Sequence, residues 1–210
     1  MSEVKVDKIS PRSGTDVTLG DASDTFTIPA SATLDVNGTI DVTGATVTGL
    51  SAGKVLQVVQ VTKTDAVSVS NSGSPIALVS TGLEGSITPA STSNKVLILL
   101  SFNLDTYHDC YPYYQVYRDL SALTGAMGAA SGTKTRSAVA LATQWETTQL
   151  SLNYLDSPGV DTSTTYKLMW GSSGVGYLGL NAIYMNRTQA DSNDKYVRSA
   201  SYMTLMEIEG

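Results

Sequence analysis

The sequence contains few of the residues that most often carry catalysis or bind metals. Its 210 residues include one cysteine, Cys110, and one histidine, His108. A single cysteine cannot form an intrachain disulfide, which excludes the small secreted folds that disulfides hold together. A metal site needs three or four ligands, and a catalytic nucleophile needs a base and a group that orients the base. A Cys110–His108 pair is a poor candidate for either, so the sequence predicts no enzyme activity and no cofactor.

Charged residues are also scarce. They make up 15% of the chain, against roughly 25% in a typical soluble domain. The lysines and arginines are scattered, and the formal net charge is −6. Because a grip on phosphates needs clustered cations, we expect no nucleic-acid partner.

Long hydrophobic runs are missing as well. The longest, VLILL at 96–100, is far shorter than the ~20 residues of a membrane-spanning helix. The first ten residues, MSEVKVDKIS, contain no apolar signal core. We therefore expect synthesis in a cytoplasm without a signal peptide, and no insertion into a membrane.

Serine, threonine, glycine and valine take the place of the missing charges, which is typical of an all-β protein. From residue 55 onward, short segments with strand character alternate with turn sequences such as NSGSP and DSPGVDTST. This pattern predicts a jelly-roll-like β-sandwich over 55–210. The only helix candidate, 119–131, contains two glycines that favour a loop. The expected strands are 55–64, 75–81, 83–88, 95–105, 112–118, 136–142, 145–155, 164–170, 176–187 and 199–208.

The first 32 residues differ in character from the rest. They are polar, and Pro11 and Pro29 interrupt any regular helix or central strand. A segment with so few apolar side chains cannot bury a core of its own. Residues 1–32 are therefore predicted to be an extended N-terminal arm that lies on another chain or another protein.

A miniature repeat follows the arm. Residues 33–50 read TLDVNG, TIDVTG and ATVTG, and 51–54 form a hinge. Strand periodicity puts the apolar residues of each unit on one face, but such repeats need several stacked units for stability. Three intertwined chains satisfy that need, which predicts a short β shaft over 33–54 and a homotrimer; a plain Thr/Gly linker is the alternative. The predicted trimer interface consists of Leu34, Val36, Ile40 and Val42.

Several phrases of the sequence resemble virion fibre proteins of marine bacteriophages. The phrases are VDKISPRSGTDVTLGDASDTFTIPASATLDVNGT at 6–39, YPYYQVYRD at 111–119, TYKLMW at 165–170, AIYMNRT at 182–188 and SYMTLMEIEG at 201–210. The resemblance implies a homotrimer located in the virion, with an N-terminal attachment peptide, a slender β shaft and a jelly-roll-like head. It also implies that the arm anchors the protein to other virion proteins of the tail, baseplate or capsid. The anchoring candidates are Val6, Ile9, Pro11 and Arg12.

The chain departs from these proteins at one place. LSALTGAMGAASGTKT at 120–135 follows YRD, where the family has a short glycine-containing hairpin. Surface loops often carry binding specificity. We therefore expect the loops 119–136 and 188–198 to contribute to recognition of a host surface.

The richest cluster of aromatic residues is TYHDCYPYYQVYR at 106–118. A tyrosine offers a flat apolar face and a hydroxyl, which suits contact with a sugar ring. Its odd-numbered tyrosines share strand parity and are predicted to line one face, although packing in the core is an alternative. An acidic turn at 191–194 has oxygen ligands for calcium, although a solvated turn is the commoner case. The candidate receptor contacts are Tyr107, Tyr111, Tyr113, Tyr117, Asp191, Asn193 and Asp194.

Three functions are compatible with these features. The first is a trimeric tail fibre or spike whose head binds a host surface polysaccharide without catalysis, with avidity from three sites. The second is a capsid decoration or head-fibre protein held by its N-terminal arm. The third is a glycan hydrolase, which the sequence favours least because no recognisable pair of carboxylates is present.

Overall fold

We describe the chain from a computed structural model. The described residues are 9–18, 21–39, 54–107, 110–140, 147–174, 180–192 and 197–210. The chain separates into two units, Met1–Val47 and Thr48–Gly210, and each is described by itself. We call them the N-terminal unit and the β-sandwich unit.

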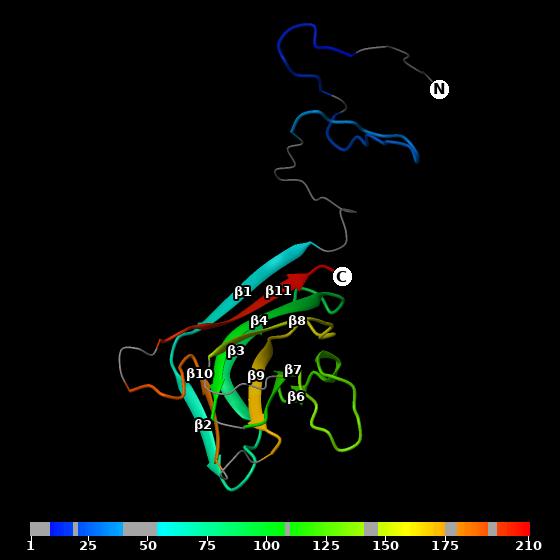
Figure 1. Ribbon diagram of the computed structural model, residues 1–210. Helices are drawn as coiled ribbons and strands as arrows, with labels where there is room; N and C mark the ends of the chain where they lie inside the picture. The colour runs from blue at the N-terminus through cyan, green and yellow to red at the C-terminus, as the bar shows by residue number, and fades with distance from the viewer. Residues whose placement is uncertain are drawn as a thin grey trace. The chain divides into compact units, whose positions relative to one another are not determined.

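The N-terminal unit buries almost nothing in its described stretches. Every residue of 9–18 and 21–39 is exposed except Pro11, which is half-buried, and neither stretch contains a strand or a helix (Figure 1). Leu34 and Val36 of the predicted trimer interface are both exposed. Among the anchoring candidates, Ile9 and Arg12 are exposed. Val6, Ile40 and Val42 lie outside the described residues.

The β-sandwich unit is all-β, as predicted, and its strands are antiparallel. Sheet A contains β1 (Val55–Lys63), β2 (Val67–Ser72), β4 (Lys95–Thr106), β8 (Thr148–Asp156), β10 (Leu180–Met185) and β11 (Ser201–Ile208). Sheet B contains β3 (Val79–Ile87), β5 (Pro112–Arg118), β6 (Ser121–Ala122), β7 (Val139–Ala140) and β9 (Thr164–Ser172). The only helical turn among the described residues is the 3₁₀ turn η1 (Thr124–Ala126), and none of their helices is long and apolar enough to span a membrane.

Sheet A is arranged around β4. One side of β4 pairs with β8, and the other side pairs first with β11 and then with β10. β1 pairs with β11 and β2 pairs with β10, so β1 and β2 together form one edge of the sheet. Between β10 and β11 the chain leaves the sheet, and an isolated bridge between Arg187 and Arg198 closes the base of this excursion.

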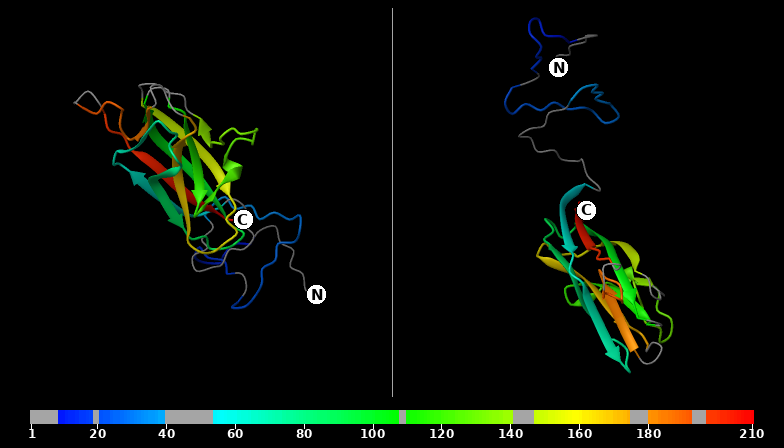
Figure 2. Two further views of the ribbon diagram at one scale, coloured as in Figure 1. Left: turned by 90° about the horizontal axis from the view of Figure 1, so that it is seen from below. Right: turned by 60° about the vertical axis from the view of Figure 1, so that its left-hand side comes forward.

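The core lies between the two sheets (Figure 2). Strand alternation sends every second side chain inward, and β4 follows this pattern with buried Ile98, Leu100, Phe102 and Leu104. The rings of Phe102 and Tyr114 meet across the sheets with centroids 5.6 Å apart. Burying such side chains contributes about 1.5–3 kcal/mol each. The inward residues of sheet B include Leu83, Tyr114, Val116, Tyr166, Leu168 and Trp170.

The strand pattern differs from the sequence expectation at three places. Residues 79–81 and 83–87 of the two predicted strands 75–81 and 83–88 belong to one strand, β3, which has an irregularity between Ser80 and Glu84, and residues 75–78 contain no strand. Strand β2 was not expected, because its serines and asparagine are typical of a loop. Of the predicted strand 136–142, only Val139–Ala140 form a strand, β7, among the described residues. As expected, residues 119–131 contain no α-helix; they form the short strand β6 and the turn η1. The two glycines of that segment, which weaken a helix, are the physical reason.

Candidate functional site

The four candidate tyrosines lie on two different sheets. Tyr113 and Tyr117 are on β5 of sheet B, and Tyr111 directly precedes that strand. Tyr107 follows β4 of sheet A, where its N–H donates to the carbonyl of Ala182 at 2.8 Å. The prediction that all four line one face is wrong for Tyr107, because residue parity holds only within a strand and the chain changes sheets between 107 and 112.

The tyrosines of sheet B lie against the sheet. Tyr113 and Tyr117 are half-buried on the outer face of β5, alternating with the buried Tyr114 and Val116. The ring of Tyr113 covers Gly171, where a Cβ would lie only 2.9 Å from the ring. Burial raises the pKa of Tyr113. Of these three tyrosines, Tyr111 is the most exposed, at 57%.

Tyr107 contributes to a hollow on the outer face of sheet A. The hollow has a volume of about 240 Å³. Ala182 lies directly opposite Ser70 in the β10–β2 pair, and its short side chain leaves the space that the longer tyrosines flank. Because Ile183 is fully buried, the neighbouring Ala182 and Tyr184 point outward. The hollow is lined by Ser70, Asn71, Ser72, Tyr107, Asn181, Ala182 and Tyr184.

Tyr184 connects this hollow to the base of the 187–198 loop. The guanidinium carbon of Arg187 lies 4.7 Å from the centroid of the Tyr184 ring, a cation–π distance. Burial raises the pKa of Tyr184, so its phenol is a neutral donor and acceptor near pH 7. The hollow therefore combines aromatic walls with hydroxyl and amide groups, and it has one cation beside it.

Asp191 holds the 187–198 loop together. Its carboxylate accepts hydrogen bonds from the guanidinium groups of Arg187 and Arg198. Asn193 and Asp194 lie outside the described residues. Within the described part of the chain, no group of three or more His, Cys, Asp or Glu side chains is placed to hold a metal ion. The calcium alternative gains no support from Asp191, because two arginines already neutralise it.

The 119–136 loop is folded onto the sandwich. The guanidinium group of Arg136 donates to the carbonyls of Thr124 and Gly128, both at 2.7 Å. Gly125 lies so close to the hydroxyl of Tyr154 on β8 that a Cβ at this position would clash with it. The tip of the β5–β6 turn is different, since Leu120 there is 90% exposed.

Cys110 is placed as a core residue. It is buried, and burial raises the pKa of its thiol to about 11. Such a thiol is protonated at neutral pH and is a poor nucleophile. Its sequence neighbour His108 lies outside the described residues.

Tyr184, Ala182 and Ser70 were not singled out by the sequence. The signal for Tyr184 was present, because alternation around Ile183 puts residues 182 and 184 on the same face. Strand β2 was not predicted, and without it Ser70 has no predicted neighbour on β10. No protein-family model matches the chain, and no curated protein matches it either.

Proposed function

We propose that this protein is a non-enzymatic structural component of a bacteriophage virion, a homotrimeric tail fibre or spike whose jelly-roll-like head binds a host surface polysaccharide. The hollow on sheet A carries the binding part of the proposal. Its tyrosines offer flat apolar faces to the C–H side of a sugar ring. The hydroxyls of Ser70 and Ser72 can donate to and accept from sugar hydroxyls. The amides of Asn71 and Asn181 are held by hydrogen bonds to the carbonyls of Pro75 and Ser74. The resemblance of the sequence to phage fibre proteins supports the assignment to a virion.

The outer face of sheet A supports the assembly part of the proposal. Val58 pairs with Met206, Met206 with Leu97, and Leu97 with Leu155. Residues in register on neighbouring strands share a face, so these four side chains form an apolar row across the sheet. We call it the apolar row. Val58 is 54% exposed and Leu155 is 46% exposed.

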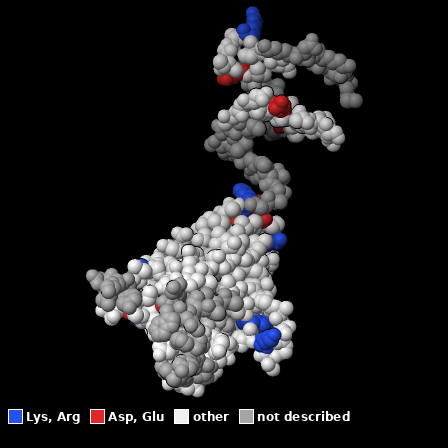
Figure 3. Space-filling view, in the orientation of Figure 1, with Lys and Arg blue, Asp and Glu red and all other residues white. Residues whose placement is uncertain are grey.

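Further copies of the same chain fit this face better than another acidic or basic partner. The chain has a net charge of −6, so two copies repel each other wherever their acidic groups meet. The apolar row and the rows beside it contain no Asp or Glu, and depletion of charge is typical of an interface core. Figure 3 shows few charged side chains on the side of the β-sandwich unit that faces the viewer. The rows beside the apolar row contain Gln60, Thr62, Leu99, Ser101, Ser151, Asn153, Tyr202 and Thr204.

The N-terminal unit adds a second reason to expect partners. Its described stretches expose Phe26, Ile28, Leu34 and Val36. A chain of this kind gains its burial from other molecules. We assign the arm to attachment within the virion and the 33–54 segment to the trimer axis, as the resemblance implies.

Binding to bacterial surface polysaccharides tests the proposed function. We expect the full chain to bind at least one polysaccharide in an array of bacterial surface polysaccharides. Tyr184→Ala should weaken that binding about tenfold, which corresponds to a loss of about 1.4 kcal/mol of binding free energy. Tyr184→Phe keeps the ring and reports on the hydroxyl alone.

Tyr111→Ala is the matched control, because it removes an exposed tyrosine from sheet B and leaves the hollow intact. Loss of binding in Tyr111→Ala with full binding in Tyr184→Ala would move the contact to sheet B and refute the hollow. Absence of binding to every polysaccharide would refute the adhesive role.

A further inference from the structure

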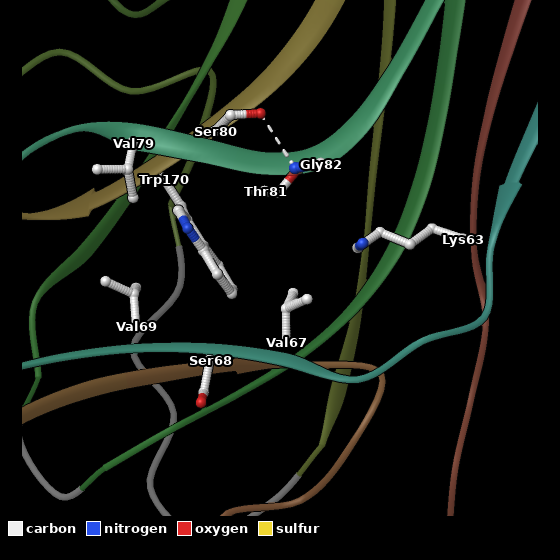
Figure 4. A pocket seen from close by; sticks show the side chains of 9 residues that line it. All are labelled: Lys63, Val67, Ser68, Val69, Val79, Ser80, Thr81, Gly82 and Trp170. Carbon is white, nitrogen blue, oxygen red and sulfur yellow. Dashed lines mark hydrogen bonds between the residues drawn. The ribbon is translucent and has the colours of Figure 1, made fainter.

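A second cleft opens between the edges of the two sheets. It lies between β2 of sheet A and β3 of sheet B, and its volume is about 450 Å³, within the usual range for small-molecule sites. Figure 4 shows the indole of Trp170 standing between the two strands and the ammonium group of Lys63 reaching in from one side. Val67, Val69 and Val79 supply apolar walls. We call it the Lys63 cleft.

Lys63 is an unusual residue at this position. Inward positions of β1 hold Val59 and Val61 before it, yet Lys63 places a cation there, with a side chain only 10% exposed. Its counter-ion is Asp65 on the following turn, whose side chain is 66% exposed and accepts hydrogen bonds of 2.8 and 3.0 Å from the Lys63 ammonium. The cation is thus held inside the molecule, while its partner carboxylate is in water. Because the Asp65 carboxylate is solvated and the Lys63 ammonium is not, a ligand anion that enters the cleft can replace Asp65 as the partner of Lys63.

Strand β3 is shaped around this ammonium group. Three residues of β3, 81–83, lie opposite Leu168 of β9 in a wide irregularity of the register. Gly82 has a φ of +76°, and a Cβ there would lie 3.1 Å from the Lys63 nitrogen. The Thr81 hydroxyl fixes the irregularity by donating to the Leu168 carbonyl at 2.8 Å. The irregularity in β3 is therefore held in one conformation, as β-bulges next to binding sites often are.

Trp170 provides a polar group that has no partner. Its indole N–H is buried and finds no acceptor among the described residues. A buried donor left unpaired is unfavourable, so a ligand acceptor at this N–H would be stabilising. Figure 4 shows the nitrogen on the side of the ring that faces Val69 and Val79. The cleft thus has a cation at one side, an unpaired N–H at the other, and valine walls between them.

We propose that the Lys63 cleft binds an acidic sugar residue, with its carboxylate on Lys63 in place of Asp65 and a ring or hydroxyl oxygen on the Trp170 N–H. A uronic acid combines an anion, hydroxyl oxygens and C–H faces in one ring, which matches the three kinds of group that line the cleft. The proposal rests on the proposed function for the source of the sugar, an acidic surface polysaccharide. It adds a site that is separate from the Tyr107–Tyr184 hollow and selects for charge.

Titration of the full chain with D-glucuronate tests this site directly. Tryptophan fluorescence is the readout, in a Trp145→Phe background where Trp170 is the remaining tryptophan. We expect a saturable change with glucuronate. D-glucose and acetate should each bind at least about tenfold more weakly than glucuronate. D-glucose lacks the carboxylate and so loses the charge-assisted contact with Lys63, and acetate lacks the ring and so loses the apolar contacts with the valines.

Two variants should move the affinity in opposite directions. Lys63→Met removes the cation and should weaken glucuronate binding about tenfold or more. Asp65→Asn removes the competing carboxylate and should tighten binding up to about fivefold. Asp65→Asn removes the counter-ion of an ammonium that is only 10% exposed, so circular dichroism checks that both variants are folded. The comparison of glucuronate with acetate on the unaltered side chains keeps the test decisive where either variant unfolds.

The outcomes separate this site from the hollow. Unchanged binding in Lys63→Met, weaker binding in Asp65→Asn, equal binding of acetate, or no binding of glucuronate would each overturn the proposal. Tyr184→Ala should leave glucuronate binding unchanged, since that residue does not line the cleft. Failure of the polysaccharide experiment with intact glucuronate binding would therefore refute the adhesive role and leave the Lys63 cleft standing as a site for an acidic sugar.

Discussion

Asn186 connects four segments of the β-sandwich unit through one side chain. Its amide N–H group donates to the carbonyls of Lys63 and Asp65 at 2.8 and 3.1 Å, and its amide oxygen accepts from the Ser201 hydroxyl at 2.6 Å. Its backbone N–H donates to Asn103. Asn186 is fully buried and has a φ of +61°, a conformation that asparagine tolerates better than most residues. One residue thus fixes the junction of β1, β4, β10 and β11.

Replacing this residue should be costly. We expect Asn186→Ala to lower the free energy of unfolding by about 3 kcal/mol, because buried carbonyls lose their donors and alanine is strained at positive φ. Urea denaturation measures the change. Asn153→Ala, on the exposed side of β8, is the control and should cost less than about 0.5 kcal/mol. A loss below about 1 kcal/mol for Asn186→Ala would show that the junction is held by other contacts.

At the scale of elements, a buried carboxylate ties β11 to β1 and to the 88–94 turn. Glu207 accepts from the Ala90 N–H and the Asn94 amide at 2.6 Å, and from the Gln57 amide at 2.7 Å. Burial acts to raise the pKa of Glu207, but the hydrogen bonds from Asn94, Ala90 and Gln57 outweigh it and hold the pKa below its usual range. The ionised form is thus the one that the fold stabilises.

The link between these elements should weaken in acid. Since the folded pKa of Glu207 lies below the unfolded value of about 4.3, its contribution is complete above that value and is lost as the pH falls through the folded pKa. We expect Glu207→Gln to cost about 1–3 kcal/mol at pH 7 and to flatten the loss of stability on acidification. Urea titrations at pH 7 and at about pH 4 measure both effects. A variant with the same acid sensitivity as the parent would contradict this role.

Some strands of the β-sandwich unit could be predicted from the sequence and others could not. Long alternating segments such as 95–105 and 199–208 were predicted as strands because one face is buried, and burial imposes the alternation. Strand β2 was not predicted, because its sequence VSVSNS has polar residues on the outer face and because β2 pairs with β10, which is distant in the sequence. The hollow depends on the pairing of β2 with β10, so neither Tyr184 nor Ser70 was recognised as a candidate. Tyr107 was placed on the wrong face, because odd–even parity was carried across the point where the chain changes sheets. Lys63 and Trp170 likewise have no sequence signal as neighbours, because they lie on β1 of sheet A and β9 of sheet B, which only the packing of the two sheets brings to one cleft.

At the scale of the whole molecule, the proposed self-association relies on the apolar row of a chain whose net charge is −6. Light scattering on the full chain should give roughly three times the chain mass of 22.1 kDa. Leu155→Asp puts a negative charge into the apolar row and should shift the protein toward the monomer, because a buried unpaired charge is strongly unfavourable.

Leu120→Asp is the matched control for that experiment. It makes the same change at a residue that is 90% exposed on the β5–β6 turn, so the mass should remain that of the parent. A monomeric parent would refute the homotrimer. A trimer that tolerates Leu155→Asp would place the contacts between copies elsewhere.

The pairing between the start of β1 and the end of β11 determines where a tag or linker can be attached to the protein. Val55, where β1 begins, pairs with Ile208, where β11 ends, so the chain enters and leaves the β-sandwich unit at the same end. The Tyr107–Tyr184 hollow lies at the opposite end of β4, beyond the pair of Leu104 with Met185. A tag, dye or surface linker joined at residue 210 will therefore be remote from the hollow. Immobilisation through that end leaves the hollow open to ligand in every binding measurement described above.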